Sequence, residues 1–388
     1  MPTAPPAQPS PAQIDALVAD LTALGAQVRE ASPEADLAHM RRVAFAGRLA
    51  TVIGVLAAGL GPNPVAILAL SLGRFARWTM IGHHVGHRGY DRVGGPKGKA
   101  FAEGARRLVD WFDWLVPAAW KHEHNVLHHY RLNEERDPDL VEANLEWLRR
   151  SNLPVPVRVL VVGFFALTWR WAYYAPNTIA ELHRADQEGE LPRGVMTWDP
   201  RRPAGRDLWR LSILPYVGLH FVAFPALFLP FGWQVAAGAL LNSLLAEALT
   251  NLHSFLVIVP NHAGGDLYRF TGPGKGKRDF LVRQVLGSAN FRTGGHLNDF
   301  LHGFLNYQIE HHLWPDLPMA AYQRAQPAVR ALCAAHGVPY VQESVWRRLV
   351  KTVRVMVGLD SMRVWVEPER SEAARPGGER AEPSPSLA

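Results

Sequence analysis

Residues 295–315 read GHLNDFLHGFLNYQIEHHLWP and place Gln308, His311 and His312 on one short segment that stops at Pro315. If this segment is helical, Gln308 and His311 share a face, while His312 is turned by about 100° from His311. Neighbouring imidazoles on a helical wall suit a metal that prefers nitrogen ligands. A pair of adjacent histidines can equally be structural. The interpretation of this stretch therefore depends on the histidines that precede it.

Two further groups of histidines follow the same pattern upstream. In HHVGH, His83 and His87 are four residues apart and share a helical face, directly after an apolar run. In HNVLHH, His124 and His128 are again four apart, and His129 lies one step round the helix. Each group alone is moderate evidence for a metal site, and together they indicate one.

One more candidate, His262, follows Asn261 at the end of the final apolar run. The eight candidate ligands are His83, His87, His124, His128, His129, His262, His311 and His312. Four-coordinate zinc takes three or four protein ligands, so eight imidazoles with solvent suit two metal ions, and imidazole suits iron. Possible additional or supporting residues are His84, Asn261, Asp299, Gln308 and Glu310.

Carboxylates near these groups can orient the imidazole N–H groups of metal ligands. The candidates are Asp91, Asp137, Asp139, Asp299 and Glu310. The alternative for Asp137-Pro138-Asp139 is a simple turn.

Apolar runs surround the histidine groups and predict an integral membrane protein. The expected transmembrane runs are residues 43–60, 65–82, 211–229 and 233–259. Each is close to the roughly 20 residues that cross a bilayer. Arg74 lies deep in the second run, so it must snorkel or face the protein. A buried helical hairpin in a soluble protein is the alternative for the first pair.

An even number of membrane crossings must separate histidine segments that lie on the same side of the membrane. Segments 124–129 and 308–312 must lie on one side of the membrane to share metals, yet three apolar runs separate them. Residues 155–174, with two Arg and two Trp, are expected to form an interfacial helix instead. The fold class is therefore all-α, with four transmembrane helices in two hairpins under a helical cap that holds the histidines.

Charge predicts the orientation of this arrangement. Arg41, Arg42 and the basic segment 193–210 lie on one side, and the uncharged turns 61–64 and 230–232 on the other. By the positive-inside tendency, the histidine-bearing face is cytoplasmic, at the inner or cytoplasmic membrane if the source is bacterial.

The composition limits which sites and partners the rest of the chain can have. The 388 residues contain one cysteine, Cys333, which excludes an internal disulfide and a Cys-based zinc or iron–sulfur site. The formal charge of +6 fits a membrane surface or an acidic protein partner, and we expect no nucleic-acid partner. We expect an extension with an amphipathic helix at 1–35, a membrane domain at 36–350, and a mostly disordered tail at 351–388.

The boxes HHVGH, HNVLHH and QIEHH, set around paired apolar runs, resemble the membrane fatty acid desaturase family. The stretches LHHYRLNEERDPDLVE and LNYQIEHHLWPDLP are also similar to that family's patterns, and the resemblance covers roughly residues 43–340. It implies a cytoplasmic di-iron centre held almost wholly by histidine above four transmembrane helices. It also implies an O2-dependent reaction that draws two electrons from an outside carrier.

The resemblance carries the family's ligands over to the matching positions of this chain. These are His83 and His87, then His124, His128 and His129, then His311 and His312, with His262 as the extra ligand after the last membrane helix. Many members have histidine where this chain has Gln308. That substitution resembles the front-end branch, which inserts a double bond between an existing one and the carboxyl end.

The expected function is an O2-dependent fatty acyl desaturase that acts on a lipid acyl chain through two iron ions. No HPGG motif of a fused cytochrome b5 occurs, so we expect a separate electron donor of the ferredoxin or cytochrome b5 type. One alternative is a di-iron hydroxylase or ketolase of an alkane, sterol or carotenoid. Another is a non-enzymatic membrane protein that binds haem or metal through a few histidines.

Overall fold

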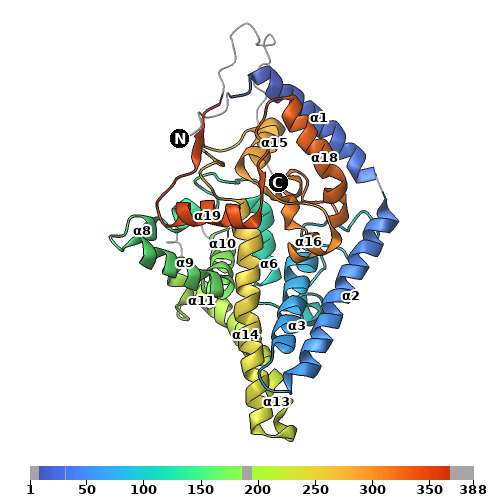
Figure 1. Ribbon diagram of the computed structural model, residues 1–388, viewed down its shortest axis with the longest axis vertical. Helices are drawn as coiled ribbons and strands as arrows, with labels where there is room; N and C mark the ends of the chain where they lie inside the picture. Colours follow the sequence, from blue (N-terminus) through green and yellow to red (C-terminus); the bar gives the residue numbers. More distant parts are fainter. Residues whose placement is uncertain (1–7, 31, 186–194, 368–388) are drawn as a thin grey trace.

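The computed structural model describes residues 8–30, 32–185 and 195–367. It is mostly helical, with apolar helices in the lower part of the view and a second group of helices above them (Figure 1). The Pro-rich start at 1–7 and the end of the expected tail at 368–388 lie outside the described residues.

The lower part is built from four longer helices and the short ones that join them. The longer helices are α2 (Pro33–Ala58), α3 (Pro64–Phe75), α9 (Val155–Trp169) and α14 (Trp233–Ile258). The shorter ones are α4 (His83–Gly86), α5 (Arg107–Asp110), α6 (Pro117–Trp120), α7 (Val141–Asn144), α8 (Glu146–Arg149), α10 (Ala175–Ala185), α11 (Pro203–Asp207), α12 (Leu214–Val217) and α13 (Phe224–Ala226).

The upper part holds the remaining helices and two small sheets. Its helices are α1 (Pro11–Glu30), α15 (Gly276–Gly287), α16 (His296–Leu301), α17 (Gln308–Leu313), α18 (Met319–Ala335) and α19 (Val345–Met356). Parallel pairs join β1 (Tyr268–Phe270) to β4 (Arg363–Trp365) and β2 (Asn290–Phe291) to β3 (Gln342–Glu343).

The amphipathic helix expected near the N-terminus is α1. It starts with a reciprocal cap, because the Ser10 N–H donates to Gln13 Oε1 at 2.8 Å and the Gln13 N–H donates to Ser10 Oγ at 3.3 Å. Ile14, Leu17 and Leu21 are fully buried where α1 packs along α18 (Figure 1). The extension is therefore part of the upper helical layer.

Four helical stretches are long and apolar enough to cross a membrane, namely Pro64–Gly86, Val155–Arg184, Pro203–Phe231 and Trp233–Asn261. Three match expected runs, but the set includes 155–184, which was expected to be interfacial, and omits 43–60. The omission has a simple cause: the last 18 residues of α2 contain Arg41, Arg42 and Arg48. α2 nevertheless packs along α3 for most of its length.

The described structure continues past residue 350, where the sequence predicts the start of a mostly disordered tail. α19 crosses that boundary, and β4 pairs with β1 beyond it. Arg348 explains why, since this fully buried side chain donates to the carbonyls of Pro260 and Ala263, at 3.2 and 2.9 Å. The segment after 350 is thereby fixed to the loop that carries His262.

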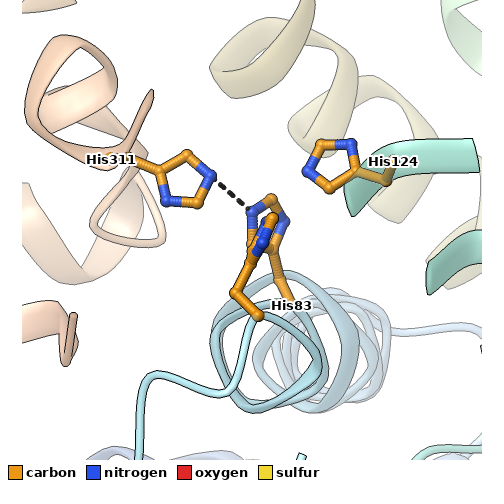
Figure 2. A group of neighbouring side chains, drawn as sticks. His83, His124 and His311 are labelled. Atoms are coloured by element: carbon orange, nitrogen blue, oxygen red, sulfur yellow. Dashed lines mark hydrogen bonds between the residues drawn. The ribbon is translucent and has the colours of Figure 1, made fainter. Parts of the chain in front are cut away.

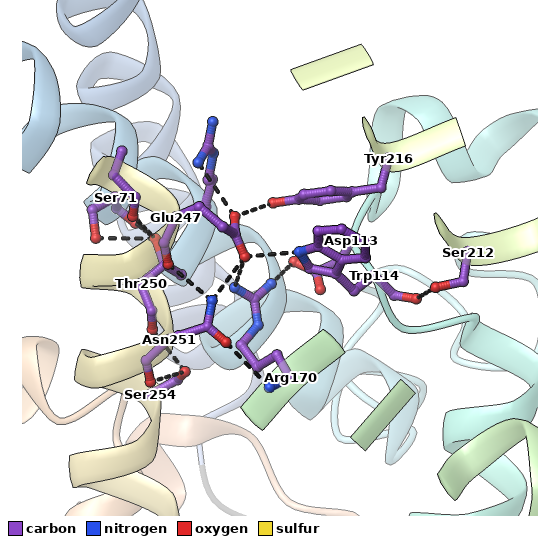
Figure 3. A network of polar contacts seen from close by, with 12 residues as sticks. Ser71, Asp113, Trp114, Arg170, Ser212, Tyr216, Glu247, Thr250, Asn251 and Ser254 are labelled. Carbon is purple, nitrogen blue, oxygen red and sulfur yellow. Dashed lines mark hydrogen bonds and ion pairs between the residues drawn. The ribbon is translucent and has the colours of Figure 1, made fainter. Parts of the chain in front are cut away.

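A buried polar network joins the lower helices (Figure 3). Its centre is Glu247 on α14, which accepts from Trp114 Nε1 at 2.8 Å, Asn251 Nδ2 at 2.9 Å and Tyr216 OH at 2.5 Å. Arg170 and Arg74 form ion pairs with the same carboxylate, at 3.2 and 3.3 Å. Arg74 thus faces the protein, which removes the difficulty of a charge deep in an apolar run.

Candidate metal centre

The first group of facing imidazoles combines residues from early and late parts of the sequence. His83, His87, His124 and His311 are buried, and their nearest ring nitrogens all lie within 4.8 Å of one another. Nε2 of His83 and Nε2 of His311 are 3.0 Å apart, although 228 positions separate the residues. Figure 2 shows the rings of His83, His124 and His311 turned toward one another. Imidazole nitrogens that converge in this way can coordinate a metal cation.

A second group lies beside the first. His128, His262 and His312 are buried, with ring nitrogens again within 4.8 Å of one another. Nε2 of His262 lies 3.0 Å from Nε2 of His312 and 3.0 Å from Nε2 of Gln308. Asn261 holds Gln308 from behind, since its Nδ2 donates to Gln308 Oε1 at 3.3 Å and to the Leu305 carbonyl at 2.9 Å.

His129 links the two groups. Its Nε2 lies 3.3 Å from Nε2 of His124, and its ring stacks on His312 with centroids 4.3 Å apart. Its centroid also lies 4.5 Å from that of His87. All eight predicted ligands therefore come together in one buried site with two lobes.

Local π-helical winding explains this placement. Residues Lys121–His128 form a π-helix, and the His129 N–H donates to the carbonyl of His124 at 3.1 Å. In this winding, residues five apart share a face, so His124 meets His129 as well as His128. A second π-helix, Ala76–Gly82, leads directly into His83.

Outer partners fix the rings at their far nitrogens. His128 Nδ1 lies 2.9 Å from Asp137 Oδ1, and Asp137 itself accepts the Asn133 N–H at 2.7 Å. His312 Nδ1 lies 2.9 Å from Gln284 Oε1. In this geometry each Nδ1–H donates outward, which leaves Nε2 free to face a metal.

The protonation states also fit a metal site. Burial lowers the pKa of His87, His124 and His311 well below the ordinary value, so these rings are neutral and can donate a lone pair. Burial also acts to lower the pKa of His128, but Asp137 outweighs it and the pKa is raised. Within the described chain, the buried His87 Nε2 and His129 Nδ1 have no hydrogen-bond partner. Unsatisfied buried nitrogens of this kind fit metal binding.

Several predicted supporting residues do not contact the histidines. Asp299 accepts from Tyr307 OH at 2.9 Å, and Asp91 accepts the Gly98 N–H at 2.7 Å. Glu310 accepts from Asn290 Nδ2 and Tyr340 OH, each at 2.8 Å, and serves the packing behind the site. Asp139 does lie with His124 and His128 in a third group of close ligand atoms. His84 donates Nδ1–H to the Met80 carbonyl at 2.6 Å, with its ring centroid 5.8 Å from that of His311.

The sequence does not identify three contact residues of the site. Gln284 on α15 holds His312 and also donates to the His129 carbonyl at 3.0 Å. Tyr322 OH lies 3.2 Å from His311 Nδ1, and the Trp120 ring stacks on His124 with centroids 4.6 Å apart. None of them belongs to a histidine motif. Only Trp120 could be suspected from the sequence, because it lies four residues before His124.

A narrow apolar cavity of about 180 Å³ ends at this site. His124, His128 and His262 form its inner wall. Its remaining lining is largely aromatic and aliphatic and includes Leu145, Phe165, Trp169, Tyr174, Ile258 and Val259. An apolar chain is the ligand that such walls accept.

Comparison with known proteins assigns the chain to a family. The family model for fatty acid desaturases matches residues 37–344. An NADPH-dependent stearoyl-CoA 9-desaturase of Mycobacterium tuberculosis is 27% identical over 390 residues, which cover 95% of this chain and 85% of that protein. A Delta(8)-fatty-acid desaturase of Arabidopsis thaliana is 27% identical over 62% of this chain and 52% of its own. An acyl-lipid (7-3)-desaturase of Rebecca salina is 29% identical over 64% and 55%. No solved structure matched. The chain belongs to the fatty acid desaturase family and is an oxidoreductase of that class.

Proposed function

We propose that the eight buried histidines hold two iron ions, and that the protein uses them with O2 to introduce a double bond into a long fatty acyl chain. The observation that supports this most strongly is the pairing of two lobes of imidazole nitrogens across residue 129. The first lobe takes His83, His87, His124 and His311, and the second takes His128, His262 and His312, with His129 between them.

Iron, when bound with O2, supplies the oxidising power that an unactivated methylene C–H requires and that no side chain can supply. The protein's own groups do the positioning. Asp137 and Gln284 keep the Nδ1–H of His128 and His312 directed outward. The apolar cavity presents one stretch of chain to the inner wall and excludes water from it.

Gln308 distinguishes the second lobe from the first. Its amide lies at hydrogen-bonding distance from His262, where many family members place another imidazole. We assign it a supporting role, since an amide is a weaker ligand for iron than imidazole is. The relative from Arabidopsis thaliana is named a Delta(8)-desaturase, which favours the front-end interpretation, while the relative from Mycobacterium tuberculosis is named a stearoyl-CoA 9-desaturase.

The proposal includes an orientation in the membrane. By the positive-inside tendency, the histidine site lies on the cytoplasmic face. By the parity argument, one of the apolar stretches between His129 and His311 does not cross. We assign this role to 155–184, because its second half, α10, packs against α6 and the π-helix that carries His124. Electrons then reach the site from a redox protein on the cytoplasmic side.

Fatty-acid profiling in a host of defined lipid composition tests the function. We expect a new cis double bond, located by mass spectrometry, that appears only with O2 and disappears in the His312→Ala variant. The matched control is His302→Ala, because the His302 ring bonds the carbonyl of Asn298 in α16 and belongs to neither group of facing imidazoles. An added oxygen atom in place of the double bond would contradict the proposal.

A further inference from the structure

Two neighbouring cavities are lined by residues of α2 and α3 and are separate from the cavity at the histidines. They have volumes of about 360 and 270 Å³ and share Thr51, Gly73 and Arg77 in their walls, so we treat them as one arginine groove. The groove runs between α2, α3 and the helical stretch Pro203–Phe231, and α2, α3 and α13 lie together in Figure 1. Among the described residues, it shares no wall residue with the cavity at the histidines.

The two ends of the groove differ in chemistry. The larger cavity is mostly apolar, with Val55, Leu70, Leu219, Ala223, Phe224 and Leu227 in its walls. The smaller cavity adds Arg48, Arg106 and the carboxylate of Asp110, which is paired with Arg106. The two cavities thus place an apolar wall beside a group of arginines that outnumbers its carboxylate.

Two of the arginines in the groove, Arg48 and Arg77, are not held by an ion pair among the described residues, although Asp113 lies near enough to act on Arg77 electrostatically. Arg74 is paired with Glu247, and Arg106 is paired with Asp110 at 2.8 Å. Arg48 and Arg77 make no ion pair or side-chain hydrogen bond within the described part of the chain. His220, in the wall of the larger cavity, likewise has a buried Nε2 with no partner there.

An unpaired guanidinium inside an apolar helix is costly, and polar groups at such depth mark binding sites. Arg77 lies in the π-helix Ala76–Gly82, six residues before His83, so it is about one to two helical turns from the histidine site. In the proposed orientation, this level lies toward the phosphates of the nearer leaflet. Arg77 and Arg48 can hold a phosphate by charge-assisted hydrogen bonds while an acyl tail lies along the apolar wall.

We propose that the arginine groove is a binding site for one anionic phospholipid, separate from the substrate site. The phosphate lies between Arg48 and Arg77, and one acyl tail lies along the wall formed by Leu70, Leu219 and Phe224. The inference rests on charge and shape in the groove and holds whether or not the protein is a desaturase.

Native mass spectrometry of the purified full-length protein tests the proposal by titration with phosphatidylglycerol and phosphatidylcholine. We expect the wild type to bind phosphatidylglycerol at least about tenfold more tightly than phosphatidylcholine. Arg77→Gln and Arg48→Gln should each remove most of this preference and leave phosphatidylcholine binding unchanged. The matched control is Arg42→Gln, an exposed arginine on the same helix outside both cavities.

Equal binding of the two lipids by the wild type would overturn the proposal, as would full retention of the preference in Arg48→Gln and Arg77→Gln. Arg48 is exposed, so its variant remains informative if Arg77→Gln folds poorly. Inorganic phosphate serves as a third probe. Displacement of phosphatidylglycerol by millimolar phosphate would show a site for the free anion and would also contradict a lipid site.

Discussion

Asp137 shows how one carboxylate can fix the geometry of a proposed metal ligand. It is fully buried, and it accepts from the Nδ1–H of His128 and from the backbone N–H groups of Asn133 and Asp139. The DPD sequence is therefore a turn and also a contact that supports the His128 ring. The turn holds the carboxylate in place, and the carboxylate holds the ring.

Asp137→Asn should lower the affinity for iron by about 10- to 100-fold, because the amide cannot hold His128 with the same charge or tautomer. Iron content after dialysis against a graded chelator measures the effect. Asp91→Asn is the control, since Asp91 bonds Arg88 and the Gly98 N–H. Equal iron retention in wild type and Asp137→Asn would count against a positioning role.

Glu310 lies next to a predicted ligand, and its burial makes the stability of the fold depend on pH. Burial raises its pKa to about 7, from an ordinary value of 4.5. As pH rises from about 4.5 to about 7, the unfolded chain releases a proton that the folded chain keeps, so the folded state loses stability in this window, by about 3 kcal/mol at most. Glu310→Gln should therefore lose less thermal stability between about pH 5 and pH 8 than wild type. Parallel pH profiles of the unfolding midpoint would refute this.

The histidine-bearing helices illustrate what the sequence could and could not predict. The spacing of four in His83–His87 and His124–His128 correctly places each pair on a shared face. It cannot predict the π-helical turns, because these depend on how Lys121–His128 packs in the folded protein. The contact between His124 and His129 follows from that winding. The sequence cannot identify Gln284 for a related reason, since α15 contacts the site only through tertiary packing.

The cavity between α9, α14 and α19 is the element-level test of substrate binding. Leu145 is buried in its wall, so Leu145→Trp should fill the space and lower turnover at least about tenfold while iron content stays at the wild-type level. Leu153→Trp is the control, because Leu153 is exposed and outside the cavity. Unchanged product yield in Leu145→Trp would mean that the acyl chain lies elsewhere.

Across the whole chain, the apolar runs and histidine motifs predict a mostly helical protein with helices that can cross a membrane and a buried group of histidines that can hold metal, and the structure has these features. The apolar runs alone do not decide which helices cross. Length and composition favour 155–184 as a membrane helix over α2, which carries three arginines. The parity argument favours α2 instead and leaves 155–184 at the membrane surface. Order beyond residue 350 was also unpredictable, since it depends on Arg348 reaching the loop at Pro260.

Cysteine labelling tests the proposed orientation. In a Cys333→Ala background, Leu60→Cys should react with a membrane-impermeant maleimide on intact cells, because Leu60 is 82% exposed at the turn between α2 and α3. Lys275→Cys, on the exposed loop before α15, should react only after lysis. The reverse pattern would place the histidine site on the outer face.

The metal content of the purified, folded protein tests the central claim most directly. Convergence of eight imidazoles predicts about two iron ions per chain by elemental analysis. His87→Ala, His128→Ala and His312→Ala should each lower that content and abolish turnover, while His302→Ala should leave both unchanged. Folded, active protein without iron, or full iron content and turnover in all three variants, would contradict the account.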